Sequence, residues 1–294
     1  MNNNILIIGN GFVGKKMANF FTTNNYNNAE VMHMHSLKYF DQTGVNIVDN
    51  KLATSNVEYV INCVGYTGKP NVDGCEDNKE DTWYLNVVWP TILANLCSKY
   101  GAKLINISSG CIYSGYEKEY TEDCTPDFGL YNQESSWYSK TKHACELSLK
   151  NLDNVFNFRI RMVITGNLNE GKNYLTKILK YNNLIDYKNS KTVMEDLLEF
   201  TSRFIQTDKR EKLNPGNYNV VNPNPLTTKQ ITDILDEFGF WNPNWKWINL
   251  DKLYESTKCG RSNCVLSTEY TQKSTGIFIP SEEESLRKVL KNGK

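Results

Sequence analysis

Near the start of the sequence stands Ile5-Leu6-Ile7-Ile8-Gly9-Asn10-Gly11-Phe12-Val13-Gly14, and the predicted fold begins with this segment. The all-apolar run predicts a strand buried on both faces of a parallel sheet. Glycines in the pattern GxGxxG follow, and then apolar residues at helical spacing. In such a turn the glycines let the backbone approach a pyrophosphate, which the helix N-terminus attracts. The stretch therefore predicts a dinucleotide site containing Gly9, Gly11, Phe12, Val13 and Gly14, with an ordinary glycine-rich turn as the alternative.

Strand and helix patterns alternate through the following residues. Helical patterns separate further predicted strands, which lie at 30–33, 57–64, 103–107 and 156–164. This alternation implies right-handed crossovers and a doubly wound α/β fold, with ligands beyond the carboxyl ends of the parallel strands. We expect residues 1–165 to form the dinucleotide-binding domain and residues 166–294 mainly a smaller, mixed substrate lobe. A helix at 193–206 and a strand near 216–222 are expected to return to the sheet.

Local signals complete this outline. Residues 114–135 are expected to form a polar loop, and one long helix is expected to include 83–96. Thr228 is expected to cap a helix that runs through Ile231 and Ile234.

Composition excludes several classes of protein. Lysine plus arginine and aspartate plus glutamate number 33 each, so no basic field attracts nucleic acid or an anionic membrane. No apolar run approaches the length of a membrane span, and the one near the start is too short for a signal peptide. The 8 cysteines form no Cys-x-x-Cys pair, which argues against a zinc site or a disulfide framework. We therefore expect a soluble, cytoplasmic protein without a metal, nucleic-acid or membrane partner.

The pair Tyr138 and Lys142 indicates proton-transfer chemistry. On a helix, residues four apart share a face. A neighbouring ammonium favours the phenolate and is expected to lower the tyrosine pKa toward the working range of a reductase. Ser109 falls at the end of a predicted strand, where such a site would lie. The alternatives are a solvated lysine on an amphipathic helix and a serine in an ordinary turn.

The second predicted strand indicates which dinucleotide binds. An Asp or Glu at its end would bind the ribose 2′-hydroxyl of NAD, but here His35, Ser36 and Lys38 follow. The sequence therefore favours NADPH, although Lys38 is equally consistent with a solvated side chain. The end of the third strand is expected to complete this site with Cys63, Val64 and Gly65.

Together these residues resemble the extended short-chain dehydrogenase/reductase family, whose members have a Rossmann fold. Within it the chain most resembles the plant-type nucleotide-rhamnose synthases, which have giant-virus counterparts. The resemblance covers nearly the whole chain and rests on the blocks Gly65–Glu76, Gly110–Tyr113, Tyr138–Lys142, Arg159–Met162, Asn173–Lys177 and Arg261–Asn263. One departure is the glycine motif, because the family usually has GxxGxxG.

The resemblance implies a bifunctional 3,5-epimerase/4-reductase that converts UDP-4-keto-6-deoxy-glucose to UDP-rhamnose with NADPH. In reduction, Ser109 would bind the C4 ketone and Tyr138 would protonate it, while Lys142 tunes the tyrosine and holds the nicotinamide ribose. In epimerisation, Cys111 would be the base on one face of the sugar and Lys177 the acid on the other. A buried small residue and a solvated lysine are the alternatives for these two.

The resemblance also implies a substrate site formed by Thr67, Asn173, Arg261 and Asn263. The arginine fork would suit a diphosphate, with a surface loop as the alternative. Gly110-Cys111 stands where sugar-nucleotide 4,6-dehydratases have an Asp-Glu pair, which argues against a dehydratase.

Other interpretations stay open. The chain could be a 4-reductase that acts only on a sugar already epimerised elsewhere, or a non-catalytic module that binds the dinucleotide. The sequence does not distinguish a UDP-sugar from a dTDP-sugar. A homodimer through the helices near 82–98 and 136–150 is the family-level expectation.

Overall fold

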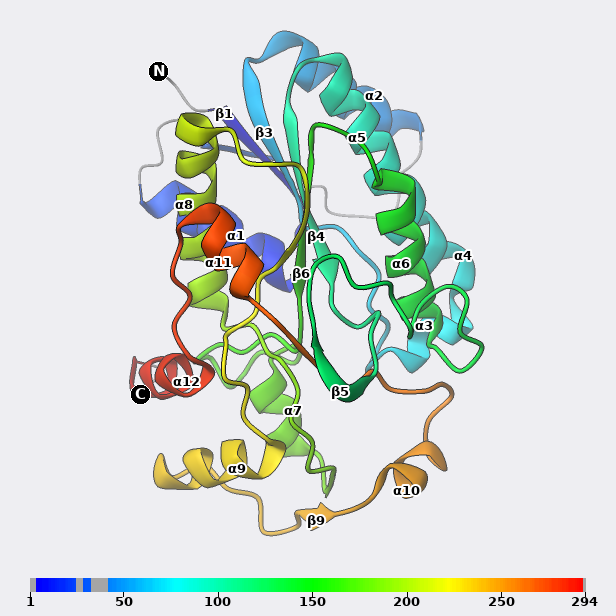
Figure 1. Cartoon of the computed structure of the whole chain (residues 1–294), viewed down its shortest axis with the longest axis vertical. Helices are drawn as coiled ribbons and strands as arrows, with labels where there is room; N and C mark the ends of the chain where they lie inside the picture. The colour runs from blue at the N-terminus through cyan, green and yellow to red at the C-terminus, as the bar shows by residue number, and fades with distance from the viewer. Residues whose placement is uncertain (1–3, 25–28, 33–41, 293–294) are drawn as a thin grey trace.

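The structure is a computed structural model that describes residues 4–24, 29–32 and 42–292. At its centre lies a six-stranded sheet in the order β2-β1-β3-β4-β6-β8, with every neighbouring pair parallel. The strands are β1 (Asn4–Ile8), β2 (Ala29–Met32), β3 (Val57–Asn62), β4 (Lys103–Ser109), β6 (Val155–Ile160) and β8 (Gly216–Asn219). Helices cover both faces of the sheet (Figure 1). The fold is the doubly wound α/β arrangement that the strand–helix alternation predicts.

Alternate residues of the strands supply the two cores, because neighbouring side chains on a strand point to opposite faces. Ile5 and Ile7 join one buried cluster, whereas Leu6 and Ile8 join the other. The first cluster includes side chains of α1 (Phe12–Thr23) and α8 (Met194–Glu211). The second includes side chains of α2 (Gln42–Thr54), α5 (Trp89–Lys99) and α6 (Trp137–Leu149). A strand with two apolar faces is therefore explained by a helix layer on each.

The helical segment before β4 has a π-helical turn in it. It consists of α4 (Lys79–Trp83), the π-helix η2 (Tyr84–Val88) and α5, and it follows α3 (Asp73–Asp77). The sequence predicts one regular helix here. A π-helical turn widens the helix by one residue and is frequent at functional sites, and this one carries the buried side chain of Asn86.

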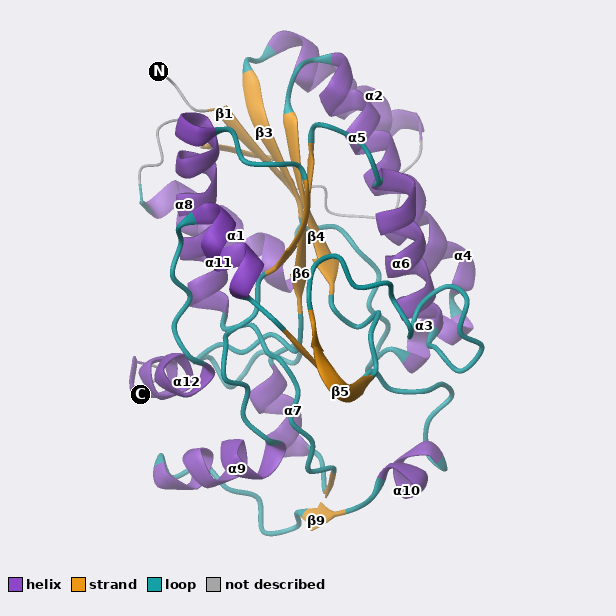
Figure 2. Cartoon of the chain, viewed as in Figure 1, coloured by secondary structure: helices purple, strands orange, loops and turns teal. Residues whose placement is uncertain are grey.

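The rest of the chain adds two small pairs of strands and further helices. β5 (Gly115–Tyr120) pairs in parallel with β10 (Cys264–Leu266), and β7 (Asn183–Leu184) with β9 (Lys246–Trp247). The expectation of a polar loop over 114–135 is therefore wrong for β5. In Figure 2, β9, α9 and α10 lie at one end of the molecule, beyond the end of the sheet where β4 leads into β5. The remaining helices are α7 (Tyr174–Lys180), α9 (Thr228–Glu237), α10 (Leu250–Tyr254), α11 (Glu269–Thr275) and α12 (Glu282–Asn292).

Two boundaries differ from the sequence-based expectation for physical reasons. The N-cap of α9 is Thr227, not Thr228, and it forms a capping box with Gln230. The strand predicted at 156–164 ends at Ile160, and the backbone at Met162 has a φ of 38°, outside the strand region.

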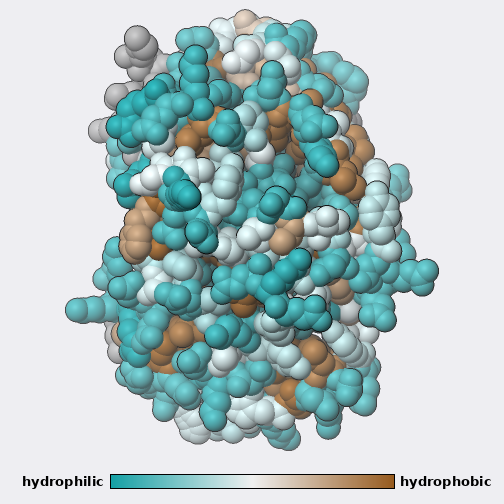
Figure 3. Space-filling view, in the orientation of Figure 1, coloured by the Kyte–Doolittle hydropathy of each residue, from teal (hydrophilic) through white to brown (hydrophobic). Residues whose placement is uncertain are grey.

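The face of the molecule drawn in Figure 3 is mostly hydrophilic. On the face in Figure 3, hydrophobic residues form small areas separated by hydrophilic ones. Over the described ranges, no helix combines the length and the apolar character that a membrane crossing requires.

Candidate active site

Helix α6 brings Tyr138 and Lys142 together. Its N-cap is Ser136, whose hydroxyl accepts a hydrogen bond from the Ser139 N–H at 3.1 Å. The Lys142 Nζ lies 5.9 Å from the centre of the Tyr138 ring and donates to the carbonyl of Ile107 at 3.3 Å. Lys142 is buried. The predicted pair therefore shares one face of a helix that packs against β4.

Ser109 and Cys111 lie beside this pair, at the end of β4. The N–H of Cys111 donates to the Ser109 hydroxyl at 3.1 Å, which fixes the turn that follows the strand. Burial raises the pKa of Tyr138 above its ordinary value and the Cys111 side chain raises it further, while the Ser109 hydroxyl lowers it. Ser109, Cys111, Tyr138 and Lys142 thus form one cluster.

The sequence leads us to expect that Lys142 lowers the pKa of Tyr138, but the net shift of this pKa is upward. Burial is the largest influence on both groups: it raises the pKa of Tyr138 and lowers that of Lys142. Cys145 and Glu146 partly offset the effect on the lysine. The Tyr138 phenol is therefore neutral near pH 7, the state in which it can donate a proton.

Two carboxylates that the sequence analysis did not single out anchor α6. Glu76 Oε1 accepts a hydrogen bond from the Trp137 N–H at 2.6 Å at the start of the helix. Further along, Glu146 accepts hydrogen bonds from Ser108 Oγ and Arg159 Nη2, both at 2.7 Å. These contacts join α6 to α3, β4 and β6. They fix where Tyr138 stands.

Asn86 and Gly65 complete the surroundings of Lys142. The Asn86 Nδ2 donates to Thr141 Oγ1 and to the Tyr66 carbonyl, and its Oδ1 accepts from the Tyr66 N–H. A Cβ added at Gly65 would lie 3.4 Å from Lys142 Nζ. The loop after β3 therefore lies against the lysine. The role of Gly65 toward the cofactor stays a prediction, and Asn86 gives no signal in the sequence.

The glycine turn after β1 has the geometry of a dinucleotide cradle. Gly9 has a φ of 124°, and a Cβ at Gly14 would overlap the carbonyl oxygen of Gly9. Gly11 is the N-cap of α1, and nothing lies within 4 Å of where its Cβ would be. Cys63 lies against Gly9 and Gly14, and its N–H donates to the Ile8 carbonyl at 2.8 Å. The chain thus leaves space for a phosphate at the start of α1, despite the shortened motif.

The other predicted cofactor residues are placed only in part. Phe12 and Val13 form the first turn of α1, and the Val64 N–H donates to Asn62 Oδ1 at 3.1 Å. His35, Ser36 and Lys38 lie outside the described residues. Their contribution to a preference for NADPH stays a prediction.

Lys177 belongs to a second group of cations. Burial lowers the pKa of Lys177, and burial together with the charge of Lys177 lowers that of Lys172. Lys172 Nζ donates to Thr67 Oγ1 at 2.9 Å and to the Gly68 carbonyl at 2.7 Å. Thr67 and Lys177 are therefore brought near one another through Lys172. Within the described residues, Lys177 makes no hydrogen bond to Cys111 or Tyr138.

The remaining predicted substrate residues make contacts within the chain. Arg261 pairs with Asp73 at 2.7 Å. The Asn263 side chain accepts from Asn189 at 2.9 Å. Asn173 is buried, caps α7 and donates to the carbonyls of residues 165 and 167. Their roles toward a substrate stay predictions.

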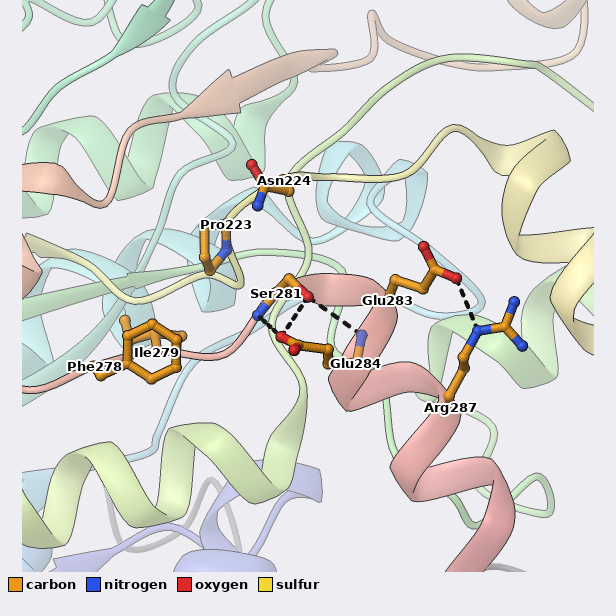
Figure 4. Close-up of a pocket in the computed structure, with 8 residues that line it drawn as sticks. All are labelled: Pro223, Asn224, Phe278, Ile279, Ser281, Glu283, Glu284 and Arg287. Atoms are coloured by element: carbon orange, nitrogen blue, oxygen red, sulfur yellow. Dashed lines mark hydrogen bonds and ion pairs between the residues drawn. The ribbon is translucent and has the colours of Figure 1, made fainter.

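A surface pocket of about 430 Å³ lies away from these groups. Figure 4 shows its lining, in which Arg287 donates a hydrogen bond to Glu283 and Ser281 donates one to Glu284. None of the predicted site residues lines it. Among the described residues, no three His, Cys, Asp or Glu side chains gather where they could hold a metal ion.

A family model described as the RmlD substrate binding domain matches residues 3–294. The chain belongs to this family. A trifunctional UDP-glucose 4,6-dehydratase/UDP-4-keto-6-deoxy-D-glucose 3,5-epimerase/UDP-4-keto-L-rhamnose-reductase of Arabidopsis thaliana is 36% identical over 78% of the chain. The chain spans about a third (34%) of that relative's length. A bifunctional dTDP-4-dehydrorhamnose 3,5-epimerase/reductase of the same plant is 34% identical and covers 79% of the chain and 76% of its own length.

Solved structures share the fold of this RmlD-family chain. The L780 UDP-rhamnose synthase of Acanthamoeba polyphaga mimivirus superposes with a TM-score of 0.84 at 23% identity, covering 98% of this chain and 99% of its own. A dTDP-4-dehydrorhamnose reductase of Bacillus anthracis in complex with NADP has a TM-score of 0.79 at 18% identity, covering 99% of each chain. These likenesses establish the Rossmann-like fold.

Proposed function

We propose that the protein is an NADP(H)-dependent reductase of nucleotide-linked 4-keto sugars. The observation that carries this proposal is the cluster of Ser109, Tyr138 and Lys142 at the end of β4. Relatives that are named as reductases of 4-keto-rhamnose nucleotides support it, as does the NADP complex of the bacterial reductase. The residues also fit the cofactor, since the glycine turn leaves space for a phosphate and Gly65 lies against Lys142.

Each residue has a defined task in the reduction. Gly9, Gly11 and Gly14 would hold the dinucleotide phosphates, and Lys142 its nicotinamide ribose. When bound, the cofactor supplies hydride to C4 of the sugar. Ser109 donates a hydrogen bond to the ketone oxygen, which polarises the carbonyl. Tyr138 then transfers its proton to that oxygen, because its raised pKa keeps the phenol protonated until negative charge develops there.

We further propose that the protein epimerises C3 and C5 before reduction, which converts UDP-4-keto-6-deoxy-D-glucose to UDP-L-rhamnose. A C4 ketone acidifies the hydrogens at both carbons. Cys111 adjoins Ser109 and interacts with Tyr138, so it is close to where the ketone would bind. Lys177 would be the acid on the other face, since its lowered pKa makes it a better proton donor.

We also propose that residues 1–165 form the dinucleotide-binding domain and residues 166–294 mainly the substrate lobe, with α8 and β8 returning to the sheet.

The test uses purified protein, NADPH and UDP-4-keto-6-deoxy-D-glucose in deuterated water. We expect NADPH oxidation, followed by absorbance, and UDP-L-rhamnose labelled at C3 and C5, identified by NMR. The absence of NADPH oxidation with both this sugar and its 3,5-epimer would refute the reductase proposal. Oxidation without label at C3 and C5 would refute the epimerase proposal alone. A dTDP-linked substrate assayed in parallel measures the preference for the nucleotide.

A reductase without epimerase activity is the second candidate, because among the described residues no hydrogen bond joins Lys177 to Cys111, whose N–H donates to Ser109, or to Tyr138. Cys111→Ser distinguishes the two. We expect it to abolish deuterium incorporation and to leave reduction of the pre-epimerised sugar intact. If incorporation continues at the original rate, Cys111 is not the base. The predicted homodimer is measured by light scattering on the same preparation.

A further inference from the structure

The loop of residues 166–173, between β6 and α7, is fixed at both of its ends. Gly166 packs against α12, because a Cβ added there would lie 2.4 Å from the carbonyl oxygen of Val289. At the other end Asn173 is buried, and its side chain donates to the carbonyls of residues 165 and 167 at 2.8 and 3.0 Å. These contacts hold the loop, which we call the crossing loop, to the C-terminal part of the chain.

The middle of the crossing loop contacts two elements on opposite faces of the sheet. Glu170 Oε1 pairs with Lys16 Nζ on α1 at 3.0 Å. Lys172 Nζ donates to Thr67 Oγ1 at 2.9 Å and to the Gly68 carbonyl at 2.7 Å, in the loop after β3. Helix α1 packs on one face of the sheet, whereas the loop after β3 leads into α3, which packs against α6 on the other face (Figure 1). The crossing loop therefore spans the edge between the two faces.

That edge is the one at which a dinucleotide binds in this fold. Strands β1 and β3 are parallel neighbours, and the glycine turn and the loop after β3 follow their carboxyl ends. Lys16 stands two residues after Gly14 of the glycine turn, where the phosphates would lie. Gly65, in the same loop as Thr67, lies beside Lys142, the residue proposed for the nicotinamide ribose. The two attachments thus stand on either side of the path that the dinucleotide would take.

We propose that the crossing loop is a gate over the dinucleotide site, held closed by Glu170 on one side and by Lys172 on the other. The gate rests on the NADP(H) binding of the proposed function but not on its sugar chemistry. Both attachments join protein groups to one another, so they oppose the entry of the dinucleotide as well as its release. Exchange of NADPH therefore requires these contacts to open.

Both attachments are weak enough to open. The Lys16 and Glu170 side chains are 26% and 28% exposed, and an ion pair of this exposure shifts an equilibrium by about two- to five-fold. Thr67 is exposed, and Lys172 keeps its second acceptor, the Gly68 carbonyl, when the Thr67 side chain is changed. The loss of either attachment is therefore expected to raise the open fraction of the gate without unfolding the protein.

The decisive variant is Glu170→Gln, for which the gate and simple electrostatics predict opposite effects on release. Stopped-flow fluorescence measures the association of NADPH, and displacement by excess NADP⁺ measures its release. A weakened gate raises both rates by about two- to five-fold and leaves the dissociation constant nearly unchanged. Removal of a negative charge near an anionic ligand would instead slow release. Loss of a direct contact with NADPH would raise the release rate alone and weaken binding.

A neutral variant tests the second attachment. Thr67→Val removes one acceptor of Lys172 and changes no charge, and we expect it to raise both rates by about two-fold or more. Glu58→Gln is the matched control, because Glu58 also pairs with a lysine, Lys209, and their side chains are 35% and 26% exposed. Glu58 stands near the start of β3, at the opposite end of the strand. We expect wild-type rates in this control.

The gate and the reductase fail by different results. If Glu170→Gln or Thr67→Val exchanges NADPH at the wild-type rates, or if the release rate of Glu170→Gln falls or rises alone, the gate proposal is wrong. Wild-type protein that binds NADPH but reduces neither the 4-keto sugar nor its 3,5-epimer would refute the reductase, and the exchange rates would still decide the gate. Wild-type protein that does not bind NADPH would refute both.

Discussion

The buried pair of Glu146 and Arg159 can be tested by Glu146→Gln, which removes one charge and almost no volume. The two side chains are 6% and 2% exposed, and the carboxylate also accepts from Ser108 Oγ at 2.7 Å. Removing one partner of a buried pair leaves the other charge uncompensated, at a cost of about 3–5 kcal/mol. We expect the lower end of this range, because the amide oxygen can still accept and Arg159 still donates to the carbonyl of Glu122 at 3.1 Å.

The assay is urea unfolding followed by tryptophan fluorescence, with the free energy of unfolding taken from the midpoint and slope. Glu283→Gln is the matched control, since Glu283 pairs with Arg287 on the exposed face of α12, and we expect no measurable change there. A loss below about 1 kcal/mol in Glu146→Gln would contradict the account of how α6 is anchored. Because α6 carries Tyr138, the variant is also expected to bind NADPH more weakly.

Three further predictions address chemistry, the glycine turn and pH. Tyr138→Phe is expected to lower the rate of NADPH oxidation by about 10²–10⁴-fold, since it removes the proton donor, while fluorescence titration finds NADPH affinity changed only a few-fold. Gly14→Ala is expected to abolish NADPH binding because its Cβ would overlap the Gly9 carbonyl, whereas Gly171→Ala, with open space around it, retains binding. Burial raises the pKa of Glu282 to about 7, so the folded state holds a proton that the unfolded chain has released between about pH 4.5 and 7. Wild-type stability against urea should therefore fall as pH rises through this window, and Glu282→Gln should show a flatter dependence; equal slopes would disprove it.

Most of the sheet follows from local signals, and the missed strand shows why the rest does not. The strands at 5–8 and 57–62 are buried on both faces, so continuous apolar runs predict them. In β5 the side chains of residues 116–119 are exposed, and no apolar pattern marks the strand. Its pairing depends on β10, which lies far along the chain.

The candidate site also contains residues that the sequence predicts and residues that it does not. The proximity of Tyr138 and Lys142 can be predicted from their spacing because both belong to one helix. The contributions of Asn86, Glu76 and Glu146 cannot be predicted from local sequence. Each side chain accepts a hydrogen bond from a residue 20 to 61 positions away. Their amide and carboxylate groups have no periodic or motif signal, and only the packing of α3, η2 and α6 brings them to the site.

The pairing of β5 with β10 orders events during synthesis. The Ser262 hydroxyl donates a hydrogen bond to the carbonyl of Tyr113, 149 positions earlier, and Leu266 packs over Gly110. While the ribosome is still translating the middle of the message, the nascent polypeptide already has its glycine turn and Tyr138, but residues 262–266, which contact Tyr113 and Gly110, have not yet been made. Contacts across such long separations form late because loop closure must precede them. A partly synthesised chain therefore has the turn at Gly110 without the residues that later pack over it.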